Sequence, residues 1–232
     1  MAGNIYLIPV TLGGDDFSKV IPEKVISLTR LLRYFIVEDI RSARRFLRLI
    51  DRGFPIDNTV FMELNEHTGE SEISDYLEPA LNGSDIGIMS EAGLPGIADP
   101  GAKITALAHR KNIKVIPLSG PSSIILALIS SGFNGQNFTF NGYLPVKPGE
   151  KIARIRELEK KSREGYTQIF METPYRNQKM FESLISSCNN DTMLCIAADI
   201  TLPSEFIRSM KICDWKKNIP SLSDKLVVFV LQ

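Results

Sequence analysis

The sequence SEAGLPGIADPG at residues 90–101 follows the apolar run DIGIM at residues 85–89 and carries the clearest structural signal in the chain. It places three glycines and two prolines in one loop, whereas an ordinary strand-to-helix connection needs only a few residues. Glycine lets a ligand approach the backbone closely, and parallel sheets bind ligands where their strands end. We therefore predict a ligand-binding loop here. Asp99 has the simpler role of capping the helix that begins at Pro100.

The segments around this loop alternate short apolar runs with longer stretches of helical periodicity. Strands are predicted at residues 4–9, 34–37, 59–64, 85–89 and 113–117. Helices are predicted at residues 22–33, 41–51, 72–81, 101–111 and 122–131. The alternation is typical of βα units, so the first half should be an α/β domain with a mostly parallel sheet and flanking helices.

The second half has a different pattern of predicted elements, with longer β segments and fewer helices. Strands are predicted at residues 137–144, 167–172, 192–198, 206–212 and 225–231, and helices at residues 150–163 and 176–187. This mixture favours a mixed sheet in a second α/β domain. We place the two domains at residues 1–120 and 121–232, with the helix at 122–131 joining the halves.

Composition narrows the class of protein. The 232 residues include 27 basic and 27 acidic side chains, so the chain has no net charge and is not a wholly basic nucleic-acid binder. A local basic surface stays compatible with this balance. The dense basic cluster is RSARR at residues 41–45 with Arg48, and such a run is more often a solvated helix face than an RNA contact.

Cysteine usage and hydropathy point to a reducing compartment. The three cysteines are widely spaced and form no CxxC pair, which argues against a disulfide framework and against a zinc cluster. No secretory leader and no run of about 18 apolar residues is present, so we expect a soluble cytoplasmic protein without a membrane partner.

Other polar loops follow the remaining predicted strands. SGPSS at residues 119–123 opens an apolar helix whose free N–H groups suit a polar or anionic ligand, although Ser122 is equally well explained as a helix cap. This loop and residues 90–101 should open on the same edge of the sheet. The segment after the first strand lacks GxGxxG, so no dinucleotide fingerprint is present.

Charged residues mark two further strand ends. Glu38-Asp39-Ile40-Arg41 follows the second strand, where a helix dipole alone accounts for both carboxylates. Asn65-Glu66-His67 follows the third strand, and a lone histidine of this kind is more often structural or solvated than catalytic.

The second half carries one motif of its own, Glu172-Thr173-Pro174-Tyr175-Arg176. A carboxylate, an aromatic ring and a guanidinium so close together are able to orient a nucleotide-like substrate by charge pairing and stacking. An ordinary helix start set by Pro174 explains the same residues equally well.

Taken together and in order, these motifs resemble the tetrapyrrole methylase superfamily, the class III S-adenosylmethionine-dependent methyltransferases. The closest likeness is to the branch of rRNA small-subunit methyltransferase I, which methylates a cytidine ribose 2′-oxygen. The likeness runs over nearly the whole chain, and its most specific part is residues 90–101. Its other parts are Pro9, residues 38–41, Asn65-Glu66, residues 120–123, Gly142-Tyr143-Leu144-Pro145 and residues 172–176.

The resemblance implies two α/β domains with S-adenosylmethionine in the cleft between them, a homodimer, and chemistry without a metal. It implies rRNA or the small ribosomal subunit as partner. The donor contacts carried over from the family are Leu7, Pro9, Glu91, Leu94, Ser122, Ser123, Ile124 and Met171. For the substrate side we predict Glu38 and Glu172 as catalytic residues, one of them a general base, and Arg41 and Arg176 as substrate-binding residues.

The chain departs from the family pattern at several positions. Thr11-Leu12-Gly13-Gly14 stands where Ile-Gly-Asn-Leu is usual, and Ile40 and Glu91 replace a threonine and an aspartate. Residues 198–202 read ADITL in place of the charged Arg-Glu-Leu-Thr-Lys. Two alternatives therefore stay open: a methyltransferase acting on a tetrapyrrole or other small molecule, and a non-catalytic module that binds the donor.

Overall fold

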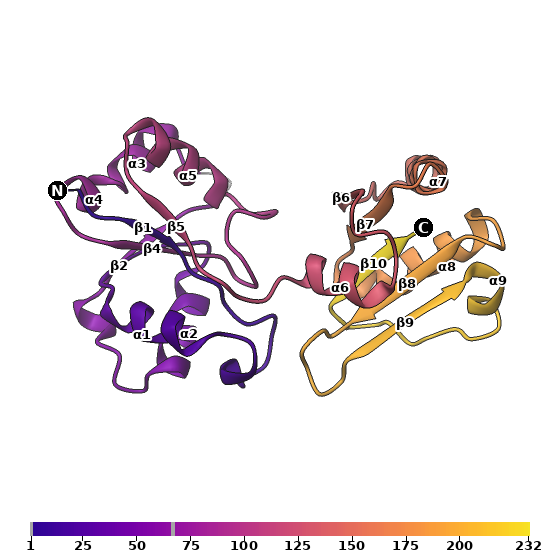
Figure 1. The fold of residues 1–232 in the computed structure, drawn as a ribbon, viewed down its shortest axis with the longest axis horizontal. Coiled ribbons are helices and arrows are strands. Elements are labelled where there is room, and N and C mark those ends of the chain that lie inside the picture. The colour runs from indigo at the N-terminus through magenta and orange to yellow at the C-terminus, as the bar shows by residue number, and fades with distance from the viewer. Residues whose placement is uncertain (1, 66–67) are drawn as a thin grey trace. The chain divides into compact units, whose positions relative to one another are not determined.

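The computed structural model describes residues 2–65 and 68–232 and divides into two compact units, Met1–Ser122 and Ser123–Gln232 (Figure 1). We call them the N-terminal and the C-terminal unit. Glu66 and His67 of the predicted third strand-end motif lie outside the described residues.

The N-terminal unit is built on a five-stranded sheet of order β3-β2-β4-β1-β5. Its strands are β1 (Ile5–Leu7), β2 (Tyr34–Val37), β3 (Val60–Glu63), β4 (Ile86–Met89) and β5 (Val115–Pro117). Every pairing in it is parallel. The predicted mostly parallel sheet is confirmed, and all five strands lie within their predicted ranges.

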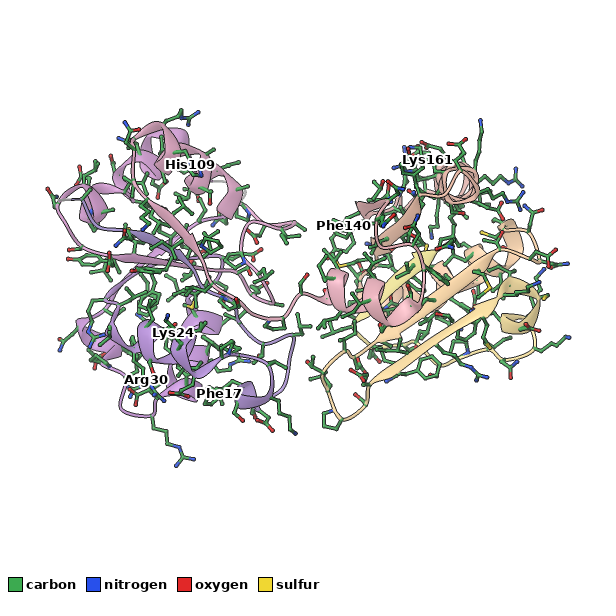
Figure 2. The ribbon with its side chains drawn as sticks, viewed as in Figure 1. Phe17, Lys24, Arg30, His109, Phe140 and Lys161 are labelled. Atoms are coloured by element: carbon green, nitrogen blue, oxygen red, sulfur yellow. The ribbon has the colours of Figure 1, made fainter. Side chains whose placement is uncertain are left out.

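Helices cover both faces of this sheet (Figure 1). Buried side chains of α1 (Glu23–Leu31) and α2 (Ile40–Ile50) share a core with one face. Those of α3 (Glu70–Asp75), α4 (Glu78–Leu81) and α5 (Gly101–Arg110) share a core with the other face. Figure 2 shows Lys24 on α1 and His109 on α5 on opposite sides of the sheet.

The strand order explains where a ligand site opens. The connections after β1 and β2 run toward the β3 edge, whereas those after β3 and β4 run toward the β5 edge. Crossovers between parallel strands are right-handed, so these two sets of helices must lie on opposite faces. Neighbouring strands whose connections diverge leave a crevice at their carboxyl ends, and β2 and β4 are such neighbours.

Two features of the N-terminal unit depart from the sequence prediction. The single helix expected at residues 72–81 is split into α3 and α4, with Pro79 in the first turn of α4. Proline has no N–H to donate to the preceding turn, so a continuous helix would lose a hydrogen bond there. Short 3-10 helices at Phe17–Lys19 and Ile56–Asn58 were not predicted.

The C-terminal unit has a five-stranded sheet of order β6-β7-β10-β8-β9. Its strands are β6 (Phe138–Tyr143), β7 (Thr167–Met171), β8 (Met193–Ala198), β9 (Phe206–Lys211) and β10 (Val227–Leu231). The β6–β7 pair is parallel and the other pairs are antiparallel, which confirms the predicted mixed sheet.

One face of this second sheet packs against α7 (Pro148–Arg163), α8 (Asn177–Ser187) and the short α9 (Ile212–Trp215), which was not predicted. The helix α6 (Ser123–Ser131) packs on β8, β9 and β10. Leu194 and Ile196 belong to the α7 and α8 core, whereas Ser209 opposite Cys195 donates to the Ser131 carbonyl at 2.7 Å. Because neighbouring strand residues point to opposite faces, α6 covers the second face of the sheet.

Candidate active site

The loops after β1, β4 and β5 contact one another at the carboxyl ends of the strands of the N-terminal sheet, which we call the site edge. The Val10 N–H donates to the Gly93 carbonyl at 2.9 Å. A Cβ on Gly93 would lie 3.3 Å from the Pro121 carbonyl oxygen, and one on Gly120 would lie 2.1 Å from Pro9 Cβ. The expectation that residues 90–101 and 119–123 open on the same edge is therefore confirmed, with the first loop beside them.

The loop at residues 90–101 needs its glycines. Gly93 and Gly96 have φ of +72° and +89°, a region that side chains with a Cβ rarely adopt. A Cβ on Gly96 would meet no atom within 4 Å, so the backbone faces open space there. Ala98 also has positive φ, at 62°. The loop thus presents backbone rather than side chains over part of its length.

Asp99 ties both ends of this turn together. The helix α5 begins at Gly101 with Pro100 at its N-cap position, one residue later than predicted, and the Asp99 carboxylate accepts the Gly101 N–H at 2.7 Å. The same carboxylate also accepts the Gly96 N–H at 2.8 Å, which the sequence did not indicate. Burial raises the pKa of Asp99, against the lowering effect of these backbone hydrogen bonds. A Cβ on Gly101 would lie 2.7 Å from the Asp99 Oδ1, so a larger residue there would displace this carboxylate.

A pocket of about 10 Å³, with room for about one water molecule, lies at the carboxyl ends of β2 and β4, the neighbours whose connections diverge. Its lining combines apolar strand residues with the carboxylates of Glu38 and Asp99. The residues are Ile36, Val37, Glu38, Leu64, Ile88, Met89, Ser90, Asp99, Pro100 and Gly101. The sequence analysis did not predict that Ser90 and the first residues of α5 line a pocket. Which residues line it depends on which strands are neighbours in the sheet.

Glu38 and Asp39 have different roles although they are neighbours. Asp39 accepts the Ser42 N–H at 2.7 Å as the N-cap of α2, and this bond lowers its pKa. Glu38 lines the pocket and accepts the Glu91 N–H at 3.2 Å. Burial raises the pKa of Glu38, and the nearby charges of Glu91, Asp99 and Asp39 add to the increase. A carboxylate in such a setting is a stronger proton acceptor than an ordinary glutamate.

The other predicted residues of the N-terminal unit also lie near the carboxyl ends of its strands. Leu7 ends β1, Pro9 packs against Gly120, and Glu91 and Leu94 belong to the loop after β4. Ser122 is buried after β5. Arg41 is exposed in the first turn of α2.

The remaining predicted residues belong to the C-terminal unit. Ser123 and Ile124 begin α6, and Met171 is the last residue of β7. Glu172 follows and is buried. Its Oε1 accepts hydrogen bonds from Arg176 Nε at 2.8 Å and from the Thr173 N–H at 2.8 Å, and Arg176 Nη2 lies 2.6 Å away.

The Glu172–Arg176 ion pair joins the first and last residues of the motif at residues 172–176. The Glu172 Oε2 atom is buried without a hydrogen-bond partner among the residues that the structure describes. The Arg176 guanidinium lies 5.2 Å from the ring centre of Tyr175, whose side chain is 73% exposed. Because its charge is paired with Glu172, Arg176 is less available to an anionic substrate than an unpaired arginine.

Residues 198–202 form a closed loop. Asp199 accepts Lys225 Nζ at 2.6 Å, the Ser204 hydroxyl at 2.9 Å and the Leu226 N–H at 3.0 Å. Asp199 and Thr201 have positive φ of 51° and 73°. No local sequence signal reveals this loop, because Lys225 lies 26 residues further along the chain.

Across residues 2–65 and 68–232, no group of three or more histidine, cysteine or carboxylate side chains is arranged to hold a metal ion. In the same part of the chain, no helix combines the length and the apolar character needed to cross a bilayer.

Comparison with known proteins gives a consistent class. No protein-family model matches the chain. Ribosomal RNA small subunit methyltransferase I of Vibrio cholerae is 28% identical over 212 residues, covering 90% of this chain and 69% of the relative. The protein of the same name from Streptococcus pyogenes serotype M3 is 28% identical over 201 residues, covering 86% of this chain and 66% of the relative.

Among solved structures, that of the methyltransferase CobJ matches with a TM-score of 0.64 over 99% of this chain and 94% of that chain. At 15% identity this likeness concerns the fold. The fold and the sequence relatives together define the chain as a methyltransferase built from two α/β units. Within that class its sequence is similar to the ribosomal RNA small subunit methyltransferases I, which confirms the resemblance seen in its motifs; it spans about two thirds of their length.

Proposed function

We propose that the protein transfers a methyl group from S-adenosylmethionine to a ribose 2′-oxygen of small-subunit ribosomal RNA. The observation that carries the proposal is the joined set of loops at the carboxyl ends of β1, β4 and β5, in a chain whose curated relatives are named for methylating this RNA. The reaction would take place in the cytoplasm, and we propose a homodimer as the working form.

The groups at the carboxyl ends of these strands suit a cofactor of this chemistry, which would lie over the loops, because the pocket beside Glu38 has room for only about one water molecule. S-adenosylmethionine presents hydroxyl and amino donors and a positive charge, and the site edge offers backbone groups at Gly96 together with the carboxylates of Glu38, Glu91 and Asp99. When bound, the donor supplies an already activated methyl group. We propose that the protein holds it mainly through residues at strand ends, in the loops that follow and at the start of α6: Leu7, Pro9, Glu91, Leu94, Ser122, Ser123, Ile124 and Met171.

The protein's own task is then to orient the acceptor oxygen and to take its proton. We propose Glu38 as the proton acceptor, because its carboxylate lines the pocket and burial raises its pKa. Arg41, one turn into α2, would contact the substrate. Glu172 stays the second candidate carboxylate, but its ion pair with Arg176 favours a positioning role in which the pair supports the exposed ring of Tyr175.

The test is calorimetric titration with S-adenosylmethionine, followed by transfer of labelled methyl groups to small ribosomal subunits purified from cells that lack the gene. We expect micromolar binding and incorporation into the RNA. Absence of binding at high micromolar donor would refute the proposal. Binding without incorporation into RNA, but with methylation of a tetrapyrrole, would instead favour the small-molecule acceptor, and binding without any turnover would favour the non-catalytic module.

A further inference from the structure

The helix α2 carries four arginines on one side, Arg41, Arg44, Arg45 and Arg48, which we call the arginine stripe. Their spacing of three, four and seven residues places them on a single face of the helix. All four side chains are exposed. The protein has no net charge, yet four positive charges lie close together on this helix. From Arg41 to Arg48 the helix rises by about 10 Å, at 1.5 Å per residue.

One carboxylate lies close to the arginine stripe, that of Asp39, whose pKa is lowered by the Ser42 N–H and also by the charge of Arg41. Within the described part of the chain, none of the four arginines forms an ion pair. Arg44 lies over the Phe61 ring at 5.2 Å, and Arg48 donates to the Arg52 carbonyl at 2.6 Å. On α7, Arg154 and Lys161 pair with Glu157 and Arg163 pairs with Glu159, whereas Arg156 and Lys160 are exposed. Like charges three and four residues apart repel, so the stripe lowers the stability of the isolated protein.

The opposite face of α2 excludes one class of partner. Ala43, Phe46, Leu47 and Ile50 are buried in the core of the N-terminal unit. A basic amphipathic helix binds a membrane by inserting its apolar face, and here that face is already packed. The arginines are left to bind anions from solution.

The stripe begins at the pocket. Glu38 lines the pocket two residues before α2 starts, and Ser42 in the first turn has its hydroxyl 3.5 Å from the Glu91 carboxylate. From there the stripe runs along the helix toward its last turn. One guanidinium group can donate hydrogen bonds to two oxygens of the same phosphate. A row of such groups therefore suits a chain of phosphates better than a single anion.

We propose that the arginine stripe binds the phosphate backbone of the RNA whose ribose is methylated, on the strand that leads away from the pocket. The proposal rests on the proposed function for the identity of the polyanion. It extends that function by assigning the docking surface to α2 rather than to α7, where Arg154, Lys161 and Arg163 are ion-paired with glutamates.

The test compares two triple variants of the full chain that lose the same charge. The first is Arg44→Gln, Arg45→Gln and Arg48→Gln, which leaves Arg41 in place. The control is Lys24→Gln, Lys103→Gln and Arg110→Gln, which removes three exposed charges scattered over α1 and α5 of the same unit. Binding of a labelled single-stranded RNA is measured by fluorescence anisotropy over a range of salt concentrations, with thermal unfolding to verify the fold and calorimetry to measure the affinity for S-adenosylmethionine.

We expect the stripe variant to bind RNA at least about tenfold more weakly. Its slope of log affinity against log salt should be shallower by about 2, because each lost phosphate contact removes roughly 0.7 for a single strand. The control should change affinity only about twofold, and both variants should keep the donor affinity.

Equal weakening by the two variants, or no RNA binding by the unaltered protein, would overturn the proposal even if donor binding is normal. Binding to phosphatidylcholine vesicles containing phosphatidylserine that is lost only in the stripe variant would also overturn it, in favour of a membrane surface. Failure of donor binding with the RNA difference intact would remove the methyl-transfer function and leave the RNA surface standing.

Discussion

Glu38 is the residue on which the proposed chemistry most depends. Glu38→Gln keeps an oxygen able to accept the Glu91 N–H but removes the proton acceptor. We expect methyl transfer to fall by about 10²–10⁴-fold, as is usual when a general base is lost. The rate of the unaltered protein should rise with pH through the pKa of Glu38, which burial places above that of an ordinary glutamate.

Stability separates this role from a structural one. A carboxyl whose pKa is raised in the fold disfavours folding once it is ionised, so Glu38→Gln should not lower the melting temperature at neutral pH. Asp39→Asn, which keeps the capping oxygen, is the matched control and should retain activity. Equal activity losses in the two variants would contradict the assignment.

Glu159 provides a prediction of the opposite sign. Although burial raises its pKa, hydrogen bonds from Thr192 and Asn189 outweigh burial and hold the pKa of Glu159 below its usual value. A lowered pKa stabilises the fold above the unfolded pKa of glutamate, and this contribution is lost as the pH falls through the folded pKa. Glu159→Gln should therefore reduce the free energy of unfolding by about 1–3 kcal/mol at pH 7, and less at acid pH.

Urea unfolding at several pH values measures this difference. Glu157→Gln on the exposed side of the same helix is the control, because surface ion pairs contribute little to stability. A pH-independent loss in Glu159→Gln would show that its carboxylate is not the stabilising form.

At the scale of elements, the contact between the β1 and β5 loops depends on the absence of a side chain at residue 120. A Cβ there would lie 2.1 Å from Pro9 Cβ, a distance that the loops cannot hold without moving apart. We expect Gly120→Ala to weaken binding of S-adenosylmethionine at least about tenfold, since a one-ångström displacement in a binding site has effects of this order. Calorimetry measures the change.

Gly149→Ala is the matched control at this scale. A Cβ on Gly149 would meet no atom within 4 Å, and the residue lies in the first turn of α7. Alanine in a helix is favoured over glycine, so this variant should be neutral or more stable by up to about 1 kcal/mol and should bind the donor normally. Normal donor binding by both variants would show that the Pro9–Gly120 contact does not shape the site.

At the scale of the whole molecule, each unit has a buried core of its own, and α6 belongs to the C-terminal unit, where it covers the sheet face opposite α7 and α8. We expect residues 123–232 to fold alone and to unfold cooperatively on heating. A fragment of residues 133–232 lacks α6 and leaves the sheet face around Cys195 and Ser209 uncovered, so it should aggregate or unfold at a much lower temperature. Circular dichroism of the two fragments measures the difference, and equal stability would contradict the role of α6.

The alternation of apolar runs and helical segments was enough to predict the two sheets, because strand and helix periods are local properties of the chain. It failed where one residue interrupts a regular pattern, as Pro79 does between α3 and α4. The position of the candidate site could be predicted in part for the same reason, whereas the roles of its residues stay predictions. Glycines and prolines at residues 90–101 mark a special loop, but the pocket is lined from β2 and β4, whose adjacency is not written in either segment.

The sequence by itself determined the class of fold, the loops at strand ends and the methyltransferase resemblance, since each depends on residues close together in the chain. Only the tertiary structure decided which charges are used. It pairs Glu172 with Arg176 and Asp199 with Lys225, and among the described residues it leaves the four arginines of α2 without an ion pair. Charge pairing depends on the distance between side chains in space, which falls to a few ångströms for residues 26 positions apart and which no local pattern encodes.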